Sequence, residues 1–207
     1  MANPYYVGMA TTSGGYWLAR TDGRVVAWGN AQNYGDMYNR SLNAPIVGIS
    51  ATYDGKGYWL LAADGGIFSF GDAVFHGSTG NIRLNQPVVG MTTTLSGNGY
   101  YLDATDGGIF AFGDAPFYGS MGGTPLNKPA VGMAADPNGG YWLVASDGGI
   151  FSFGGAGFYG STGAQNLQST INGMASSTSG NGYWLIDRLG NIYSFGDATF
   201  LGNGAAN

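Results

Sequence analysis

The 207-residue chain contains no cysteine and no glutamate, and it has a single histidine, His76. Without cysteine, disulfide bonds and thiolate chemistry are excluded, and cysteine pairing says nothing about the compartment. An enzyme needs a singular constellation of residues, whereas most polar residues of this chain recur along it, so we expect no catalytic triad and no enzyme activity. His76 takes the place that tyrosine holds in other parts of the sequence, which favours an ordinary substitution over a catalytic base.

Charged residues are also scarce, at 9% of the chain, and the net charge is −5. Since hydrophobic residues still make up 44%, the composition predicts a folded protein with an uncharged polar surface. The seven basic residues are scattered along the sequence, so no patch could neutralise a phosphate backbone. We therefore expect no nucleic-acid partner.

Long apolar runs are absent as well, and the start Met1-Ala2-Asn3-Pro4 lacks the basic and apolar regions of a signal peptide. This predicts no membrane insertion. Abundant Gly, Ser, Thr, Asn and aromatic residues favour an extracellular or cell-surface module, a prediction from composition alone. If the natural protein is secreted, this chain is its mature or excised form.

What the sequence does contain is one unit repeated along its whole length. A Tyr-aromatic-Leu core recurs at steps of 42, 42, 41 and 42 residues, at Tyr16, Tyr58, Tyr100, Tyr141 and Tyr183. The approximate repeats are residues 4–43, 44–85, 86–127, 128–168 and 169–207. No composition break separates them, so they predict a single domain over residues 1–207.

Each repeat contains four short segments of strand length. The first carries a central glycine (Gly8, Gly48, Gly90, Gly132, Gly173), as expected where another backbone approaches closely. The second and third form a hairpin around Asp-Gly, with Leu189-Gly190 in the last repeat. The fourth is expected to be an edge strand, at residues 33–36, 75–78, 117–120, 158–161 and 200–203. Forty glycines and no helical periodicity argue against helices.

Four strands in about 42 residues are typical of a propeller blade, and apolar hairpins require cover on both faces. The sequence therefore predicts an all-β fold, a five-bladed β-propeller of four-stranded antiparallel blades, closed as a monomeric ring. A trefoil needs three-fold symmetry, and β-solenoid coils are shorter than this unit. Arg20 and Asp187 replace an alanine at the expected seam, either as two surface charges or as an ion pair across it.

The motif Gly-Tyr-Trp-Leu, then Asp-Gly-Gly-Ile-Phe-x-Phe-Gly-Asp-Ala-x-Phe-Tyr-Gly-Ser, is similar to repeats of secreted actinobacterial surface and cell-wall-associated proteins. Repeats two and three match it closely, whereas Asn30, Gly155 and Leu189 depart from it. Five short blades also resemble the architecture of tachylectin-type propeller lectins. That resemblance implies N-acetylated sugars bound at one site per blade, by analogy of architecture.

The main functional hypothesis is a multivalent, lectin-like module whose partners are glycans or cell-wall polysaccharide. Sugars stack on aromatic faces and bond to carboxylates and amides, and each repeat offers such groups. The candidate ligand-binding residues are Tyr34, Asp72, His76, Ser78, Asp114, Tyr118, Ser120, Tyr159, Ser161 and Asp197. The alternative is that these aromatics only cap the blade edge. Since Gly155 and Leu201 replace the acid and the aromatic ring, repeats two and three are expected to bind best.

Other roles for the polar residues are less favoured. Asp72, Asp114 and Asp197 recur near carbonyls, but one acid per repeat makes a weak calcium site, so we expect no metal and no cofactor. Asp103 is the one off-pattern acid within a strand, and burial with a local partner is favoured over catalysis. The strand-two aromatics, such as Trp59 and Trp142, are expected to pack between blades. The competing functional class is a structural or protein-interaction scaffold.

Overall fold

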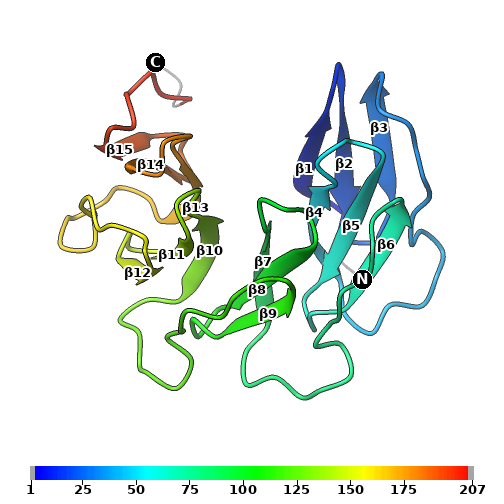
Figure 1. The fold of residues 1–207 in the computed structure, drawn as a ribbon, viewed down its shortest axis with the longest axis horizontal. Helices are drawn as coiled ribbons and strands as arrows, with labels where there is room; N and C mark the ends of the chain where they lie inside the picture. The colour runs from blue at the N-terminus through cyan, green and yellow to red at the C-terminus, as the bar shows by residue number, and fades with distance from the viewer. Residues whose placement is uncertain (1–2, 205–207) are drawn as a thin grey trace. The chain divides into compact units, whose positions relative to one another are not determined.

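The computed structural model describes residues 3–204, which form fifteen β-strands and no helix in that range. The strands make five three-stranded antiparallel sheets, one for each repeat (Figure 1). The all-β prediction is therefore confirmed. The strands are β1 (Tyr6–Thr12), β2 (Gly15–Arg20), β3 (Val25–Gly29), β4 (Ile46–Ala51), β5 (Gly57–Ala62), β6 (Ile67–Gly71), β7 (Val88–Thr93), β8 (Gly99–Ala104), β9 (Ile109–Gly113), β10 (Ala130–Ala135), β11 (Gly140–Ala145), β12 (Ile150–Gly154), β13 (Ile171–Ser176), β14 (Gly182–Asp187) and β15 (Ile192–Gly196).

The predicted fourth strand of each sheet is wrong. The segments 33–36, 75–78, 117–120, 158–161 and 200–203 contain no strand. Each includes a glycine in a backbone region that disfavours other residues, with φ from 117° at Gly35 to 136° at Gly77. Such a residue interrupts the extended backbone that a ladder needs. The backbone groups of the first four segments bind a tyrosine side chain instead, as described below.

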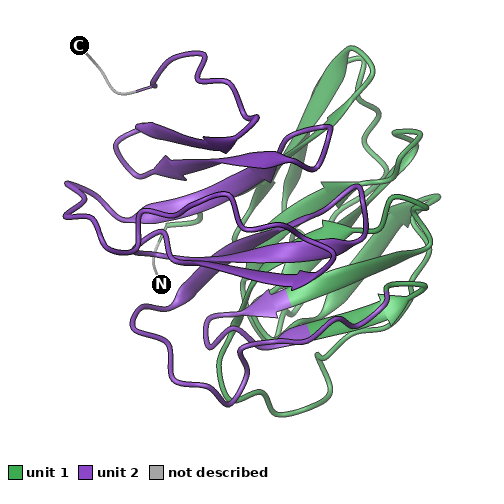
Figure 2. Cartoon of the chain, turned by 60° about the vertical axis from the view of Figure 1, so that its left-hand side comes forward, with its two compact units in different colours: residues 1–102, 110–115 green, residues 103–109, 116–207 purple. Residues whose placement is uncertain are grey.

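The chain divides into two compact units (Figure 2). Unit 1 comprises residues 1–102 and 110–115, and unit 2 comprises residues 103–109 and 116–207. Within unit 1, β1 contacts β4 and β4 contacts β7, and within unit 2, β10 contacts β13. The first strand of a repeat thus lies beside the first strand of the next, as expected of an inner strand.

The close backbone neighbour that the sequence predicts for the glycine of the first strand is found at Gly8, whereas an added Cβ atom would meet nothing within 4 Å at Gly132 and only side chains of the same sheet at Gly48 and Gly173. A Cβ atom added to Gly8 would lie 3.2 Å from the backbone nitrogen of Ile49 in the next sheet. That spacing is tighter than ordinary van der Waals contact, so glycine allows the two inner strands to approach.

The second strand of each repeat forms the core. All residues of β5, β8 and β11 are buried. Aromatic rings of successive repeats pack on one another: the centroids of Trp17 and Tyr58 are 5.2 Å apart, and those of Trp142 and Tyr183 are 5.5 Å apart. The indole N–H of Trp142 donates to the carbonyl of Gly157 at 2.6 Å. Packing between repeats is therefore confirmed within each unit.

The small residue in the third strand makes room for these indoles. Ser69 pairs with Trp59, and Ser152 pairs with Trp142. Both serine hydroxyls are buried, and neither has a hydrogen-bond partner in the described part of the chain. The serines serve as spacers, since a larger side chain would occupy the volume of the indole.

Candidate binding site at the junctions between repeats

A tyrosine hydroxyl joins each repeat to the one before it. Tyr58, Tyr100, Tyr141 and Tyr183 are all fully buried. Their hydroxyls donate to the carbonyls of Gly35 (2.5 Å), Gly77 (2.6 Å), Gly119 (2.6 Å) and Gly160 (2.7 Å) in the preceding repeat. Each hydroxyl also accepts the backbone N–H of the residue before that glycine, at 3.1–3.2 Å. Burial raises the pKa of Tyr58 to about 12, so the phenol stays protonated and able to donate.

We call this contact the tyrosine hook. It fixes the segment that carries the predicted aromatic site residue, so the ring lies against the next repeat. A Cβ atom added to the glycine that ends the third strand of the next repeat would lie only 2.8–3.0 Å from the Cγ atom of that ring. The pairs are Tyr34 with Gly71, His76 with Gly113, Tyr118 with Gly154 and Tyr159 with Gly196.

These contacts bring together residues of different repeats. The residue after the contacted glycine is Asp72, Asp114, Gly155 or Asp197. The structure therefore places Tyr34 beside Asp72, His76 beside Asp114 and Tyr159 beside Asp197, whereas Tyr118 meets no acid at position 155. The sequence had grouped the ring and the acid of the same repeat.

Hydroxyl groups from the turn between the first two strands hold the acids in place. Asp72 accepts from Thr52 at 3.1 Å. Asp114 accepts from Ser96 at 2.6 Å and from Thr94 at 2.9 Å, and the Ser96 hydrogen bond lowers the pKa of Asp114 below its ordinary value. The hydrogen bond from Ser179, 2.5 Å long, likewise lowers the pKa of Asp197. These exposed carboxylates are therefore hydrogen-bond acceptors held in a fixed orientation.

The junction without an acid carries a compensating exchange. Where the other repeats have Thr52, Thr94 and Ser177, the fourth has Asp136, and Gly155 takes the acid's usual place. Asp136 is buried, and its Oδ1 accepts the backbone N–H of Asn138 at 2.9 Å. A carboxylate at both positions would place two negative charges within hydrogen-bond reach, which Gly155 avoids.

The three predicted serines lie elsewhere. Ser78 and Asp72 flank β6 from opposite ends, because residues 73–78 run back toward the hairpin turn, where Thr79 N–H donates to the carbonyl of Gly65 at 3.1 Å. A five-residue strand spans about 16 Å. Ser120 and Ser161 hold the equivalent positions, and Ser120 Oγ accepts the N–H of Gly122 at 3.3 Å. The structure does not bring these serines to the acids.

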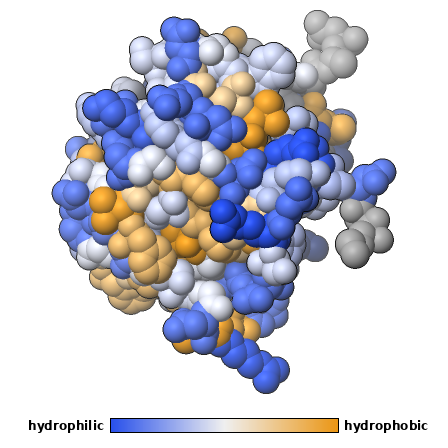
Figure 3. Space-filling view, turned by 90° about the vertical axis from the view of Figure 1, so that its right-hand side faces the viewer, coloured by the Kyte–Doolittle hydropathy of each residue, from blue (hydrophilic) through white to orange (hydrophobic). Residues whose placement is uncertain are grey.

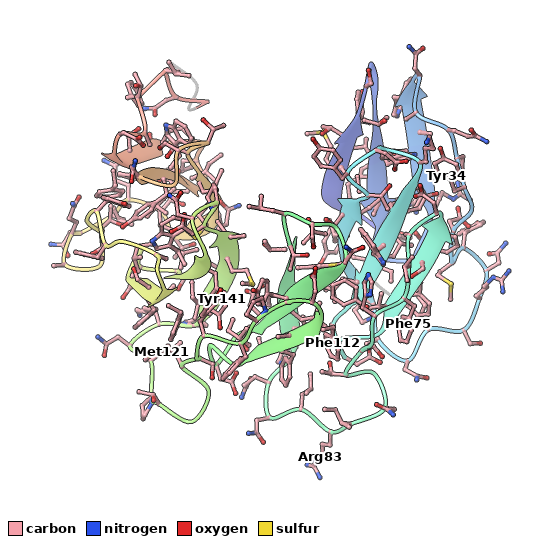
Figure 4. The ribbon with its side chains drawn as sticks, viewed as in Figure 1. Tyr34, Phe75, Arg83, Phe112, Met121 and Tyr141 are labelled. Carbon is pink, nitrogen blue, oxygen red and sulfur yellow. The ribbon has the colours of Figure 1, made fainter. Side chains whose placement is uncertain are left out.

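Sequence reasoning missed a set of phenylalanines. Phe75, Phe117, Phe158 and Phe200 are 53–64% exposed, and each stands three residues after the position of the acid. Phe75 is labelled in Figure 4. Phenylalanine is usually buried. Only its recurrence in a segment that the tyrosine hook holds and that forms no strand would have indicated an exposed ring. Thr52 and Thr94 were missed too, although each precedes its acid by 20 residues.

The two seam residues have partners in their own sheets. Arg20 forms an ion pair with Asp22 at 3.1 Å. Asp187 is 2% exposed and accepts from the side chain of Asn191 at 2.8 Å and from the N–H of Leu189 at 2.9 Å. The interpretation of Asp187 as a surface charge is therefore wrong. The Asp187 carboxylate thus accepts N–H groups of its own turn, as Asp147 accepts the N–H of Gly149 in the preceding repeat. The ion pair across the seam stays a prediction.

Asp103 lacks the local partner that was expected. It is fully buried in β8, and neither carboxylate oxygen has a hydrogen-bond partner among residues 3–204. Burial raises the pKa of Asp103 to about 7. Its equivalents Leu61 and Val144 are buried apolar residues, so the carboxyl group lies in a core position rather than in a site.

Two other features are absent from the part of the chain that the structure describes. Residues 3–204 contain no group of three or more His, Asp or other acidic side chains that could hold a metal ion. No helix in that range is long and apolar enough to cross a membrane.

Comparison with known proteins adds information on the fold. No protein-family model matches the chain, and no curated protein matches its sequence. Among solved structures, it is similar to a structural genomics protein of unknown function from Bacteroides thetaiotaomicron VPI-5482, with a TM-score of 0.62 and 12% identity. The match covers 92% of this chain and 55% of that protein, so the chain spans about half its length. At this identity the likeness shows the fold alone.

Proposed function

We propose that the protein is a multivalent carbohydrate-binding module, in which the five sheets are the blades of a β-propeller and glycans bind at the junctions. The observation that carries the proposal is the recurrence of an exposed phenylalanine three residues after an aspartate that a hydroxyl group holds. An aromatic face stacks on the C–H face of a sugar, and a carboxylate accepts its hydroxyl protons.

The surface chemistry supports a neutral ligand. Apolar residues are exposed among hydrophilic ones on the face in Figure 3, and charged residues are only 9% of the sequence. Weak sites repeated along one molecule would gain strength on a repetitive polymer such as cell-wall polysaccharide. This ligand class fits an extracellular or cell-surface protein, and the resemblance to actinobacterial surface repeats leads to the same location.

The geometry changes which junctions should bind best. A complete site needs the hooked ring of one repeat together with the acid and the phenylalanine of the next. The complete sets within one unit are Tyr34 with Asp72 and Phe75, and Tyr159 with Asp197 and Phe200, while His76 lies with Asp114. Phe158 stands with Gly155 and Tyr118, and that set lacks an acid.

A glycan array with immobilised protein, followed by titration calorimetry with the sugars it identifies, tests the proposal. The decisive variant carries Phe75→Ala and Phe200→Ala, since exposed rings can be removed with little effect on folding. Binding should fall at least tenfold, whereas Phe158→Ala, the matched control, should change it less than twofold.

Indifference of the native protein to every sugar, with no rise in its melting temperature, would reject the proposal. That outcome would favour the scaffold hypothesis, in which the exposed rings contact another protein.

A further inference from the structure

Two hollows of similar size occupy equivalent places in the two units. One, of about 420 Å³, lies between Asp64 and the connecting segment 82–87. The other, of about 460 Å³, lies between Asp147 and the segment 165–170. Both volumes are within the range of small-molecule sites. Each hollow adjoins the hairpin turn, at the other end of the third strand from the junction site of the same repeat.

The walls of both hollows are held by the same bonds. The hydroxyls of Thr79 and Thr162 are buried and donate to the carbonyls of Asp64 and Asp147, each at 3.1 Å. At the far end of each segment, Val88 N–H and Ile171 N–H each donate to the carbonyl of the residue that precedes the aspartate, at 2.9 Å. Each hollow is thus formed before any ligand arrives.

The lining offers fixed acceptors, amides and an apolar wall. Oδ1 of Asp64 accepts Gly66 N–H at 3.0 Å, and Oδ1 of Asp147 accepts Gly149 N–H at 2.9 Å. Both aspartates line their hollows, so each offers a carboxylate acceptor there. Leu84 and Leu167 pack against the core from the same segments, and exposed amides follow them at Asn85 and Gln168.

Each hollow has one cation in its lining, Arg83 or Lys128, but the two cations come from different positions in the repeat. Arg83 extends from the outer tip of its connecting segment (Figure 4), whereas Lys128 comes from the start of the fourth repeat. An anionic ligand would need a cation at the same place in both. The chemistry that the two hollows share is a carboxylate acceptor, amide donors and a leucine, which suits a neutral polyhydroxyl ring.

We infer that each hollow binds one unit of a neutral saccharide, so repeats two and four carry a second class of site. The inference takes its ligand class from the proposed function but uses different residues. Because the two classes lie at opposite ends of the sheets, one molecule would bind two polysaccharide strands and link them. Repeats one and three have Met37 and Met121 where the threonines stand, and they lack this hydroxyl tie.

Methyl-resolved NMR of the full chain tests the inference with methyl glycosides of glucose, mannose, galactose and N-acetylglucosamine as probes. The methyl signals of Leu84 and Leu167 should shift on titration with at least one probe. Asp64→Asn with Asp147→Asn keeps the turn acceptor but removes the carboxylate charge, and it should weaken binding at least fivefold. Asp106→Asn, in the third repeat, is the matched control and should leave binding unchanged.

Leucine methyl signals that stay in place with all four probes would overturn the inference, as would full affinity in the double variant. The aromatic signals of Tyr34, His76 and Tyr159 report on the junction sites. If they shift alone, the proposed function survives and the hollows are empty of sugar. If the leucine methyls shift alone, the hollows bind and the junction assignment fails.

Discussion

Asp103 and Asp187 are both buried acids in the second strand of a repeat, yet their surroundings have opposite effects. Asp187 receives hydrogen bonds from Asn191 and Leu189, which outweigh burial and lower its pKa below the ordinary value. Asp103 receives none among the described residues, and burial raises its pKa to about 7. Burial alone therefore does not decide the cost of a charge. The donors that the adjoining turn provides decide it.

Removing the unpartnered acid should have the largest effect. The raised pKa means that the folded state holds a proton which the unfolded state releases. The ionisation of Asp103 therefore costs nothing below about pH 4, and this cost grows up to about pH 7, to roughly 4 kcal/mol, while the unpaired polar group itself is unfavourable at every pH. Asp103→Leu should raise the free energy of unfolding at pH 8 by a few kcal/mol and by much less at pH 4, as measured by urea denaturation.

Asp103→Asn is the control for charge, since it keeps a buried polar group and should lose the pH dependence. Equal effects of Asp103→Leu at pH 4 and pH 8 would show that the carboxyl group is not protonated by burial.

Removing the satisfied acid should act in the other direction. Asp187→Ala leaves the N–H groups of Leu189 and Asn191 without their acceptor, and we expect a loss of about 2–3 kcal/mol at pH 7. The second substitution Leu189→Asp should restore part of it, because it rebuilds the turn of the other repeats. A double variant no more stable than Asp187→Ala would contradict this account of the turn.

The tyrosine hook provides an intermediate case of a buried polar group with partners. Tyr183→Phe leaves the carbonyl of Gly160 and the N–H of Tyr159 unpaired, at an expected cost of about 1–2 kcal/mol. Tyr16 holds the same position in the first repeat and is 38% exposed, so Tyr16→Phe should cost less than about 0.5 kcal/mol. Equal losses in the two variants, measured by thermal unfolding, would refute the role of the hydroxyl.

The smallest effect is expected at the spacer serines. Ser152 Oγ is buried opposite Trp142 with no partner in the described structure, so Ser152→Ala removes an unsatisfied group. The variant should be equal to the native protein or more stable by up to about 1 kcal/mol. A clear loss of stability in urea would indicate that the hydroxyl is bonded after all.

The repeat allowed the strands and their order to be predicted, because apolar runs and Asp-Gly turns are local signals. The fourth strand could not be excluded from sequence, since its backbone groups are taken by Tyr58 or Tyr141 about 23 residues away. The pairing of His76 with Asp114 depends on the same hook and was equally hidden. Asp187 shows a third limit, because its buried carboxylate looks like a surface charge until the turn at Leu189 is seen.

In all four hooks the hydroxyl bonds to main-chain atoms, the carbonyl of one residue and the amide of the residue before it, and the Tyr58 hydroxyl also lies 3.4 Å from the side-chain oxygen of Asn33. These main-chain hydrogen bonds do not depend on which side chain the segment has. Histidine stands at position 76, where three repeats have tyrosine. Substitutions can therefore change the aromatic residues of the junctions one at a time, while the main-chain hydrogen bonds of the tyrosine hook still connect neighbouring repeats.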